Sequence, residues 1–332
     1  MGEFELLARL RERLAQARGR VLLGSGDDAA VTAPGGATAT SIDAMVDGIH
    51  FRREWSSLAQ IGAKALATAL SDLAAMGATP GEAYVALGVP PDLDEDGCLE
   101  LLDGLAALAA TTDTALAGGD VTRAPALSLT IAVVGHAPSA EDLVTRSGAR
   151  PGDAVVVTGE LGGAAAGLLL LDPATDVSLH LPVDKAGKCK LTRLIERQLE
   201  PQARLAAGQA LAGAGATAMI DLSDGLGGDA HHIAAASGVG LRIDAAALPI
   251  ARGVAEVARA TGTDPLELVV SGGEDYELLA TLPPERVDEA AVAVAEGGLA
   301  LTRVGEVVAD EGVEVRLPDG RVSSPRGFDQ LG

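Results

Sequence analysis

The stretch that decides the fold is 217-TAMIDLSDGLGGDAHHIAAASGVGLRI-243, in which two short apolar runs flank a longer segment of helical composition. The run at 217–222 is short and apolar, as in a buried strand, and the turn signal Asp224-Gly225 follows it. Residues 226–237 predict a helix, and residues 239–243 predict a second strand. A succession of strand, helix and strand is typical of an α/β or α+β protein.

The same alternation extends in both directions from this stretch. Further strands are predicted at 21–23, 38–42, 82–89, 114–117, 127–134, 154–158 and 278–282. Further helices are predicted at 4–14, 61–76, 98–110, 161–171, 201–212 and 254–261. Residues 172–192 hold three of the four lysines with little periodicity, and we interpret them as a loop that leads into a helix.

A turn cluster, 147-SGARPGD-153, separates the alternating segments into two groups. We therefore expect two domains, residues 1–146 and residues 147–332. A chain of 332 residues is long enough for each domain to have its own core.

Composition narrows the class of function. The sequence holds 25 Lys and Arg against 47 Asp and Glu, a formal net charge of −22. Such a chain is not a general nucleic-acid binder, because phosphate backbones are held by an excess of Lys and Arg. The charge also disfavours docking on an anionic membrane. The hydrophobic fraction of 48% excludes intrinsic disorder.

Cysteine content and the length of the apolar segments indicate the cellular compartment. Two cysteines, Cys98 and Cys189, are too few for a disulfide framework. The most apolar stretch, 162–171, is far shorter than the ~20 residues that span a bilayer. Residues 1–20 are charged throughout, unlike a signal peptide. We expect a cytoplasmic protein with no membrane partner.

Aspartates in apolar or small-residue settings are the main chemical signal. They stand at positions 27, 28, 43, 47, 72, 120, 221 and 224. A carboxylate beside a buried strand is unfavourable unless it is paired or binds a metal. Asp72 follows Ser71 inside a predicted helix, where Asp is a poor residue. Converging carboxylates and Mg²⁺ together are typical of phosphoryl transfer, because Mg²⁺ bridges carboxylates to substrate phosphates.

For each of these residues a purely structural role competes with the role in metal or phosphate binding. A single Asp is often a turn or helix-cap residue. His50 follows a turn and either caps it or contacts an anion. Arg146 either binds phosphate or forms a surface ion pair. The adjacent pair His231-His232 does not share one helix face, which argues against a metal site there.

Well-known nucleotide motifs do not account for the aspartates. The string 24-GSGDDA-29 superficially matches a dinucleotide fingerprint, but the following 30-AVTAPGG-36 does not form the required helix. No Lys is followed by Ser or Thr, so a Walker A loop is absent.

Taken together, the motifs resemble one family over residues 3 to 329: thiamine-monophosphate kinase, of the aminoimidazole ribonucleotide synthetase superfamily. The strings that carry the resemblance are GSGDDA (24–29), SID (41–43), GIHF (48–51), KALA (64–67), LSDLAAMGA (70–78), GGD (118–120), TRSGA (145–149), DLSDGL (221–226) and SGGEDYEL (271–278).

The resemblance implies a fold and a reaction. It implies an N-terminal sheet domain that binds ATP and Mg²⁺ and forms a homodimer, and a C-terminal α/β domain that completes the active site. The reaction moves the γ-phosphoryl group of ATP onto thiamine monophosphate, giving thiamine diphosphate. Direct in-line transfer needs no covalent intermediate, and we assign no general base because the acceptor phosphate is already anionic.

The resemblance also assigns roles to residues. The family's Mg²⁺ positions and their neighbours fall on Asp28, Ser41, Ile42, Asp43, Asp72, Asp120, Asp221 and Asp224. Ile42 offers only its backbone carbonyl. The nucleotide positions fall on Gly119, Asp120, Arg146 and Ser223. The substrate positions fall on His50, Glu274 and Phe328, where Glu274 accepts from the aminopyrimidine and Phe328 offers a ring for stacking.

Two alternatives stay open at this point. One is another ATP-using enzyme of the same superfamily. Selenophosphate synthetase requires a reactive Cys near the N-terminus, whereas the first here is Cys98, and the hydrogenase-maturation protein requires a C-terminal Cys. The other is a non-catalytic acidic protein that binds divalent cations without turnover.

Overall fold

The computed structural model describes residues 19–23, 30–33, 35–173, 175 and 191–323. The predicted helix 4–14, most of the predicted loop 172–192, Asp28 and Phe328 lie outside these residues. The chain divides into two compact units, one comprising Met1–Leu73 and Ala78–Asp142 (unit 1) and the other Ala74–Gly77 and Leu143–Gly332 (unit 2). No helix in the described part of the chain is long and apolar enough to cross a membrane.

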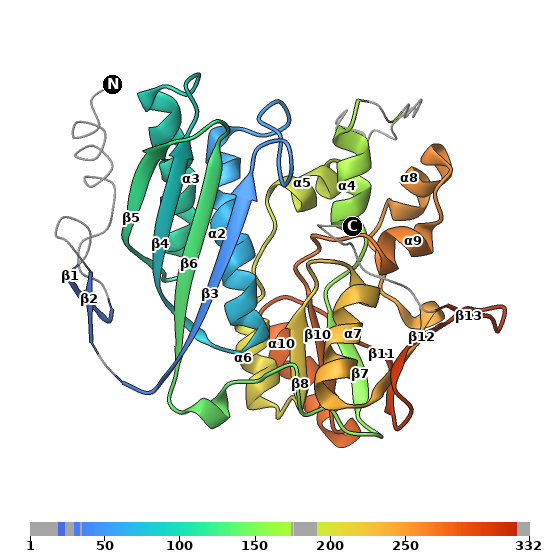
Figure 1. The fold of residues 1–332 in the computed structure, drawn as a ribbon. Helices are drawn as coiled ribbons and strands as arrows, with labels where there is room; N and C mark the ends of the chain where they lie inside the picture. The colour runs from blue at the N-terminus through green and yellow to red at the C-terminus, as the bar shows by residue number, and fades with distance from the viewer. Residues whose placement is uncertain (1–18, 24–29, 34, 174, 176–190, 324–332) are drawn as a thin grey trace. The chain divides into compact units, whose positions relative to one another are not determined.

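Unit 1 is built from a four-stranded sheet and two long helices (Figure 1). Its elements are β1 (Val21–Leu23), β2 (Val31–Thr32), β3 (Ala37–Val46), α2 (Leu58–Ala75), β4 (Thr79–Val89), α3 (Glu95–Thr111), β5 (Ala115–Arg123), β6 (Ser128–Ala137) and the 3-10 helix η1 (Ala140–Asp142). The last two residues of α2 group with unit 2. The sheet order is β3-β6-β4-β5, so β3 and β5 are its edge strands. Strand β6 runs antiparallel to β3 and β4, and β5 runs parallel to β4.

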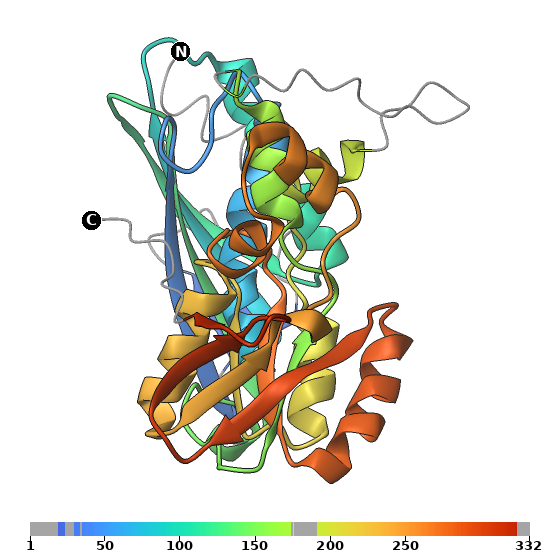
Figure 2. The same cartoon turned by 90° about the vertical axis from the view of Figure 1, so that its right-hand side faces the viewer.

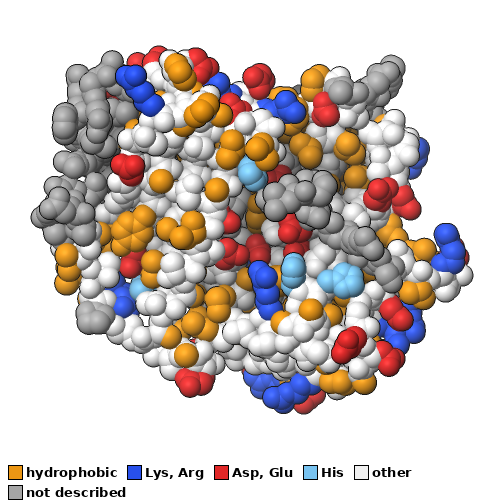
Figure 3. All heavy atoms as spheres, viewed as in Figure 1, with side chains coloured by type: hydrophobic (Ala, Val, Ile, Leu, Met, Phe, Trp, Pro, Cys, Tyr) orange, Lys and Arg blue, Asp and Glu red, His pale blue; other side chains and the backbone are white. Residues whose placement is uncertain are grey.

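Helices α2 and α3 cover one face of this sheet (Figures 1 and 2). Leu129, Ile131 and Val133 alternate along β6 toward that face and are almost completely buried. The opposite face, which we call the open face, carries Ile42, whose exposed fraction is 66%, in register with Ala132 and Tyr84. Figure 3 shows hydrophobic side chains over these strands. The sheet of unit 1 therefore has one buried and one open apolar face.

Two strands that carry predicted site residues extend beyond their predicted ends. Strand β3 continues to Val46, so Asp43 lies within the strand and not at its end. Strand β5 continues through Gly118-Gly119-Asp120 to Arg123. The ladders extend past these polar residues, because β3 pairs with β6 from Ala37 to Val46 and non-local pairing outweighs the poor strand propensity of Asp.

Unit 2 has a seven-stranded sheet of order β13-β12-β9-β11-β7-β10-β8. Its strands are β7 (Ala154–Thr158), β8 (Ala218–Asp221), β9 (Gly240–Asp244), β10 (Leu278–Leu282), β11 (Leu301–Val308), β12 (Gly312–Arg316) and β13 (Val322–Ser323). Its helices are α4 (Gly163–Leu171), α5 (Thr192–Leu199), α6 (Leu205–Gly213), α7 (Leu226–Ser237), α8 (Val254–Thr261), α9 (Pro265–Val270) and α10 (Val287–Glu296), with the 3-10 helices η2 (Ala245–Ala247) and η3 (Pro284–Arg286).

Helices cover both faces of the unit 2 sheet (Figures 1 and 2). Val155 and Val157 of β7 belong to the core that includes α7, and Val156 belongs to the core that includes α6 and α10. All three valines are fully buried, which is why β7 is a continuous apolar run. A third core joins α4, α5, α8 and α9. The mixed helix and sheet content confirms the predicted fold class.

Candidate active site

The first acidic cluster lies in unit 1, on the helix-covered face of the sheet. Ser41 and Asp43 alternate with Ile42 along β3 and so share one face. Asp72 reaches them from α2, and its Oδ2 accepts a hydrogen bond from Ser41 Oγ. Burial, together with the negative charge of the neighbouring Asp72, raises the pKa of Asp43 to about 6. Ser41, Asp43 and Asp72, the β3–α2 cluster, are thus together, as the resemblance implies.

Gly119 and Asp120 lie away from this cluster within one chain. Asp120 is in register with Ala86 on β4, which places its side chain on the open face, opposite to that of Asp43. Three strand spacings separate β5 from β3, a distance of about 14 Å. A Cβ at position 119 would lie 2.1 Å from the carbonyl oxygen of Val85, so only glycine fits there.

Unit 2 contains the second acidic cluster. Asp221 ends β8, and Ser223 and Asp224 occupy the turn before α7. Asp229, in the first turn of α7, accepts a hydrogen bond from the Asp224 N–H at 3.1 Å. Burial and the charges of Asp221 and Asp224 raise the pKa of Asp229 to about 8. Burial also raises the pKa of Asp224.

Asp229 is a residue of this cluster that the sequence alone did not place in the site. It is only 2% exposed and contacts a predicted metal ligand. The signal was present, because Gly227-Gly228-Asp229 repeats the Gly-Gly-Asp string of residues 118–120. Without the fold, however, nothing linked this repeat to Asp224.

Two basic side chains lie near the second cluster. The charges of His232 and Arg146 lower the pKa of Asp224, which opposes the effect of burial. The loop of Arg146 is held by Ser237, at the end of α7. Ser237 Oγ accepts from the Gly148 and Ala149 N–H groups at 3.1 and 3.2 Å and donates to the Arg146 carbonyl at 3.1 Å. Arg146 thus lies near the carboxylates of this cluster. At this position it suits a phosphate group that a metal ion links to those carboxylates.

The predicted substrate residues in the described part of the chain lie in different units. Glu274 follows α9 in unit 2, and its Oε2 accepts a hydrogen bond from Gln198 Nε2 of α5. His50 lies in a turn after β3 in unit 1, where its Nδ1 accepts the Val46 N–H at 3.1 Å. Through that bond His50 caps the turn, which is the first of the two roles that the sequence allows. The substrate role of His50 stays a prediction.

The potential metal-ligand atoms of both clusters fit Mg²⁺ better than a softer metal ion. They are carboxylate and hydroxyl oxygens, the hard ligands that Mg²⁺ prefers. Among the described residues, no group of three or more His, Cys, Asp or Glu forms a ready metal site. Mg²⁺ is typically held by one or two carboxylates together with water and substrate phosphates. Burial and the charge of Asp72 raise the pKa of Asp43, and a bound cation would offset both effects.

Comparisons with known proteins identify the family. Residues 26–137 match the model of the AIR synthase related protein, N-terminal domain, and residues 150–318 match that of the C-terminal domain. The chain is 42% identical over 311 residues to a thiamine-monophosphate kinase of Salmonella typhimurium, covering 93% of this chain and 91% of the relative.

Solved structures agree with the sequence comparison. The thiamine-monophosphate kinase of Stenotrophomonas maltophilia superposes with a TM-score of 0.83 at 36% identity, covering 97% of this chain and 98% of that one. A structure described as AaThiL complexed with AMPPCP and TMP gives a TM-score of 0.76 at 30% identity, covering 98% and 96%. The chain therefore belongs to the thiamine-monophosphate kinase family of AIR synthase related proteins.

Proposed function

We propose that the two acidic clusters carry out Mg²⁺-assisted, in-line transfer of the γ-phosphoryl group of ATP to the phosphate of thiamine monophosphate. The family's activity is ATP-dependent phosphorylation of thiamine monophosphate in thiamine biosynthesis, and the chain is an enzyme with this activity. The observation that carries the metal-assisted mechanism is the β3–α2 cluster, in which the half-buried carboxylates of Asp43 and Asp72 lie close together.

The chain's own residues have distinct tasks in this scheme. Asp43 and Asp72, with Asp221 and Asp224, hold Mg²⁺, which when bound neutralises phosphate charge. Arg146, Ser223 and Gly119 contact the nucleotide. Glu274 accepts a hydrogen bond from the aminopyrimidine of the substrate. Residues 1–146 form the ATP- and Mg²⁺-binding domain, and residues 147–332 complete the site.

Positioning and charge suffice for the chemistry. The acceptor phosphate is already anionic, so no side chain has to remove a proton. The chain has to align the acceptor oxygen with the γ-phosphorus and the leaving oxygen. We therefore assign no catalytic base and no covalent intermediate.

We further propose that the active form is a homodimer joined through the sheets of unit 1, with the β5 edge of each copy beside the β3 edge of the other and the open faces covered. Three features support it. The face is apolar and includes Ile42, which is 66% exposed. Both edge strands, β3 and β5, carry predicted metal ligands. Asp120 on β5 lies about 14 Å from β3 in one chain, so a second copy that places its β5 beside β3 would bring Asp120 next to the strand that carries Asp43.

The experiment that tests the proposed mechanism compares two variants of equal charge change. Asp72→Asn removes a proposed metal ligand, whereas Glu311→Gln changes an exposed residue between β11 and β12. Thiamine diphosphate formation is followed while Mg²⁺ is varied. We expect Asp72→Asn to lose activity by about 100-fold or more and Glu311→Gln to match wild type. A folded Asp72→Asn variant with wild-type turnover at low Mg²⁺ would exclude the metal role.

A cytoplasmic location stays a prediction from the composition. Membership of the kinase family excludes the non-catalytic alternative, which predicts cation binding with no thiamine diphosphate formed.

A further inference from the structure

The loop that carries Glu274 is held in an unfavourable backbone conformation. Glu274 has φ +67° and Tyr276 has φ +50°, both in the left-handed region that non-glycine residues rarely adopt. Such conformations persist only where the surroundings impose them, and they gather at functional sites. The loop therefore needs anchors that are stronger than ordinary surface contacts.

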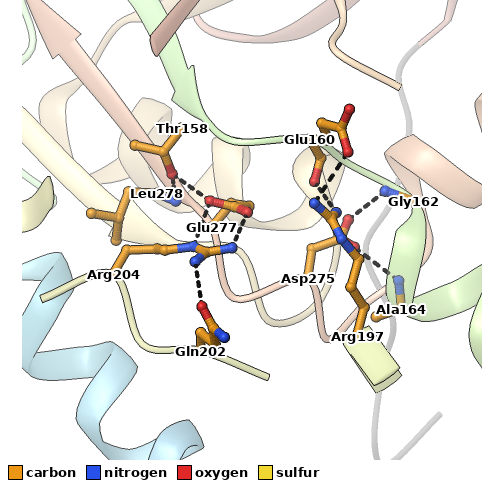
Figure 4. A network of polar contacts seen from close by, with 10 residues as sticks. All are labelled: Thr158, Glu160, Gly162, Ala164, Arg197, Gln202, Arg204, Asp275, Glu277 and Leu278. Carbon is orange, nitrogen blue, oxygen red and sulfur yellow. Dashed lines mark hydrogen bonds and ion pairs between the residues drawn. The ribbon is translucent and has the colours of Figure 1, made fainter. Parts of the chain in front are cut away.

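Glu277 provides the first anchor, as Figure 4 shows. Its side chain is completely buried and forms a two-bond ion pair with Arg204, at 2.6 Å to Nη2 and 2.9 Å to Nε. Thr158 Oγ1 donates to Glu277 Oε2 at 2.8 Å and accepts the Leu278 N–H at 2.8 Å. Both carboxylate oxygens are thus occupied, which is the geometry in which a buried ion pair is strong.

The backbone of Gly159 is shaped around this pair. Its φ is +59°, and a Cβ there would lie 2.2 Å from Glu277 Oε1. Any other residue would push the carboxylate away from Arg204. The β7 end is thus adapted to Glu277, a fit that packing of apolar groups alone would not require.

Asp275 provides the second anchor. Its carboxylate accepts the Gly162 N–H at 2.6 Å and the Ala164 N–H at 3.1 Å, where α4 begins (Figure 4). These are N–H groups that a helix leaves without internal partners. Asp275 and Glu277 therefore hold the loop on opposite sides of Tyr276, one at α4 and the other at Arg204 before α6.

The anchored loop also holds the second acidic cluster. The Glu274 N–H donates to the Ser223 carbonyl at 2.8 Å, and the Tyr276 N–H donates to the Leu222 carbonyl at 2.9 Å. The Leu222 N–H in turn donates to the Glu277 carbonyl at 2.8 Å. A displacement of Glu277 would thus move both Glu274 and the turn that bears Ser223 and Asp224.

We propose that the Arg204–Glu277 ion pair is a positioning device of the kinase, which sets the substrate-binding Glu274 and the Ser223–Asp224 turn together. This rests on the proposed function, because it takes Glu274 and Asp224 as site residues. Arg204 and Glu277 are positioning residues, since they act through the loop. Their loss should change substrate and Mg²⁺ requirements jointly.

Arg204→Lys tests the proposal, because it keeps the charge and loses the planar fork. The matched control is Arg242→Lys, whose guanidinium also meets two carboxylates, Glu306 and Glu314, on β11 and β12 away from the loop. For Arg204→Lys we expect KM for thiamine monophosphate and the half-saturating Mg²⁺ concentration both to rise, with kcat/KM about tenfold lower. Arg242→Lys should match wild type.

If Arg204→Lys does not fold, a second pair of variants tests whether Glu277 positions the site. Thr158→Val removes the hydroxyl that joins Glu277 to Leu278, and Thr158→Ser restores it. Raised KM in the first and recovery in the second support the proposal. Folded variants with lowered thermal stability but wild-type KM and Mg²⁺ dependence would overturn it. An inactive wild-type chain would instead contradict the proposed function.

Discussion

Asp120 should complete the site of a second copy of the chain, and this is open to a subunit-complementation test. The perturbation is a pair of single variants, Asp72→Asn and Asp120→Asn, each expected to be inactive. Asp72 belongs to the β3–α2 cluster, whereas Asp120 lies on the open face at the other edge of the sheet. The two carboxylates are therefore separable between subunits.

The expected magnitude follows from the topology. In a two-fold dimer each site would combine Asp72 of one copy with Asp120 of the other. A heterodimer of the two variants then has one site with both residues intact and one with both changed. Its activity per dimer should be about half that of wild type. If Asp72 and Asp120 act in the same chain, both sites carry one change and no activity returns.

The assay uses heterodimers isolated with two different affinity tags, followed by thiamine diphosphate formation. The converse heterodimer pairs wild type with the Asp72→Asn/Asp120→Asn double variant, and it should be inactive. Action within one chain predicts the opposite pattern, inactive for the first heterodimer and about half active for the second. That opposite pattern, or a wild-type chain that is active as a monomer, would show that Asp120 does not complete the site of a second copy.

Two further predictions concern unit 2. Burial raises the pKa of Asp275 from 3.8 to about 6, so its stabilising contribution is present below pH 3.8 and is lost as pH rises through 6, about 3 kcal/mol in total. Urea unfolding gives the free energy of unfolding of wild type and of Asp275→Asn. Between about pH 5 and about pH 7 the wild type should lose about 1 kcal/mol of this free energy relative to the variant. A difference that stays constant over this pH range would contradict the raised pKa. Ser237→Ala should raise KM for ATP several-fold, with KM for thiamine monophosphate unchanged, because Ser237 holds the Arg146 loop; unchanged KM for ATP would remove Ser237 from that role.

Local pattern was sufficient for most elements and for part of the site. The strand at 154–158 and the helices at 226–237 and 254–261 match their predicted bounds, because each has a continuous buried face. The alternation Ser41-Ile42-Asp43 already places the first and third side chains together on one face. Helix α9 was missed although Asp264 caps it and Pro265 starts it, since six residues give too little periodicity.

Long-range arrangement was beyond the sequence pattern. The order β3-β6-β4-β5 separates Asp120 from Asp43, and no local signal predicts which strands become edges. Glu277 stands in the motif SGGEDYEL (271–278), but only the fold shows Arg204 beside it, 73 positions earlier. Carboxylates whose partners are distant in sequence are therefore the part of such a site that structure has to supply.

In the proposed mechanism, phosphate moves from ATP to thiamine monophosphate in one Mg²⁺-dependent step. The most direct measurement incubates the purified chain with γ-labelled ATP and thiamine monophosphate, with Mg²⁺ or with a chelator. We predict that the label appears in thiamine diphosphate, that ADP forms in equal amount, and that the chelator abolishes both. Label released only as inorganic phosphate, label retained on the protein, or unchanged transfer in the presence of the chelator would contradict direct Mg²⁺-dependent transfer.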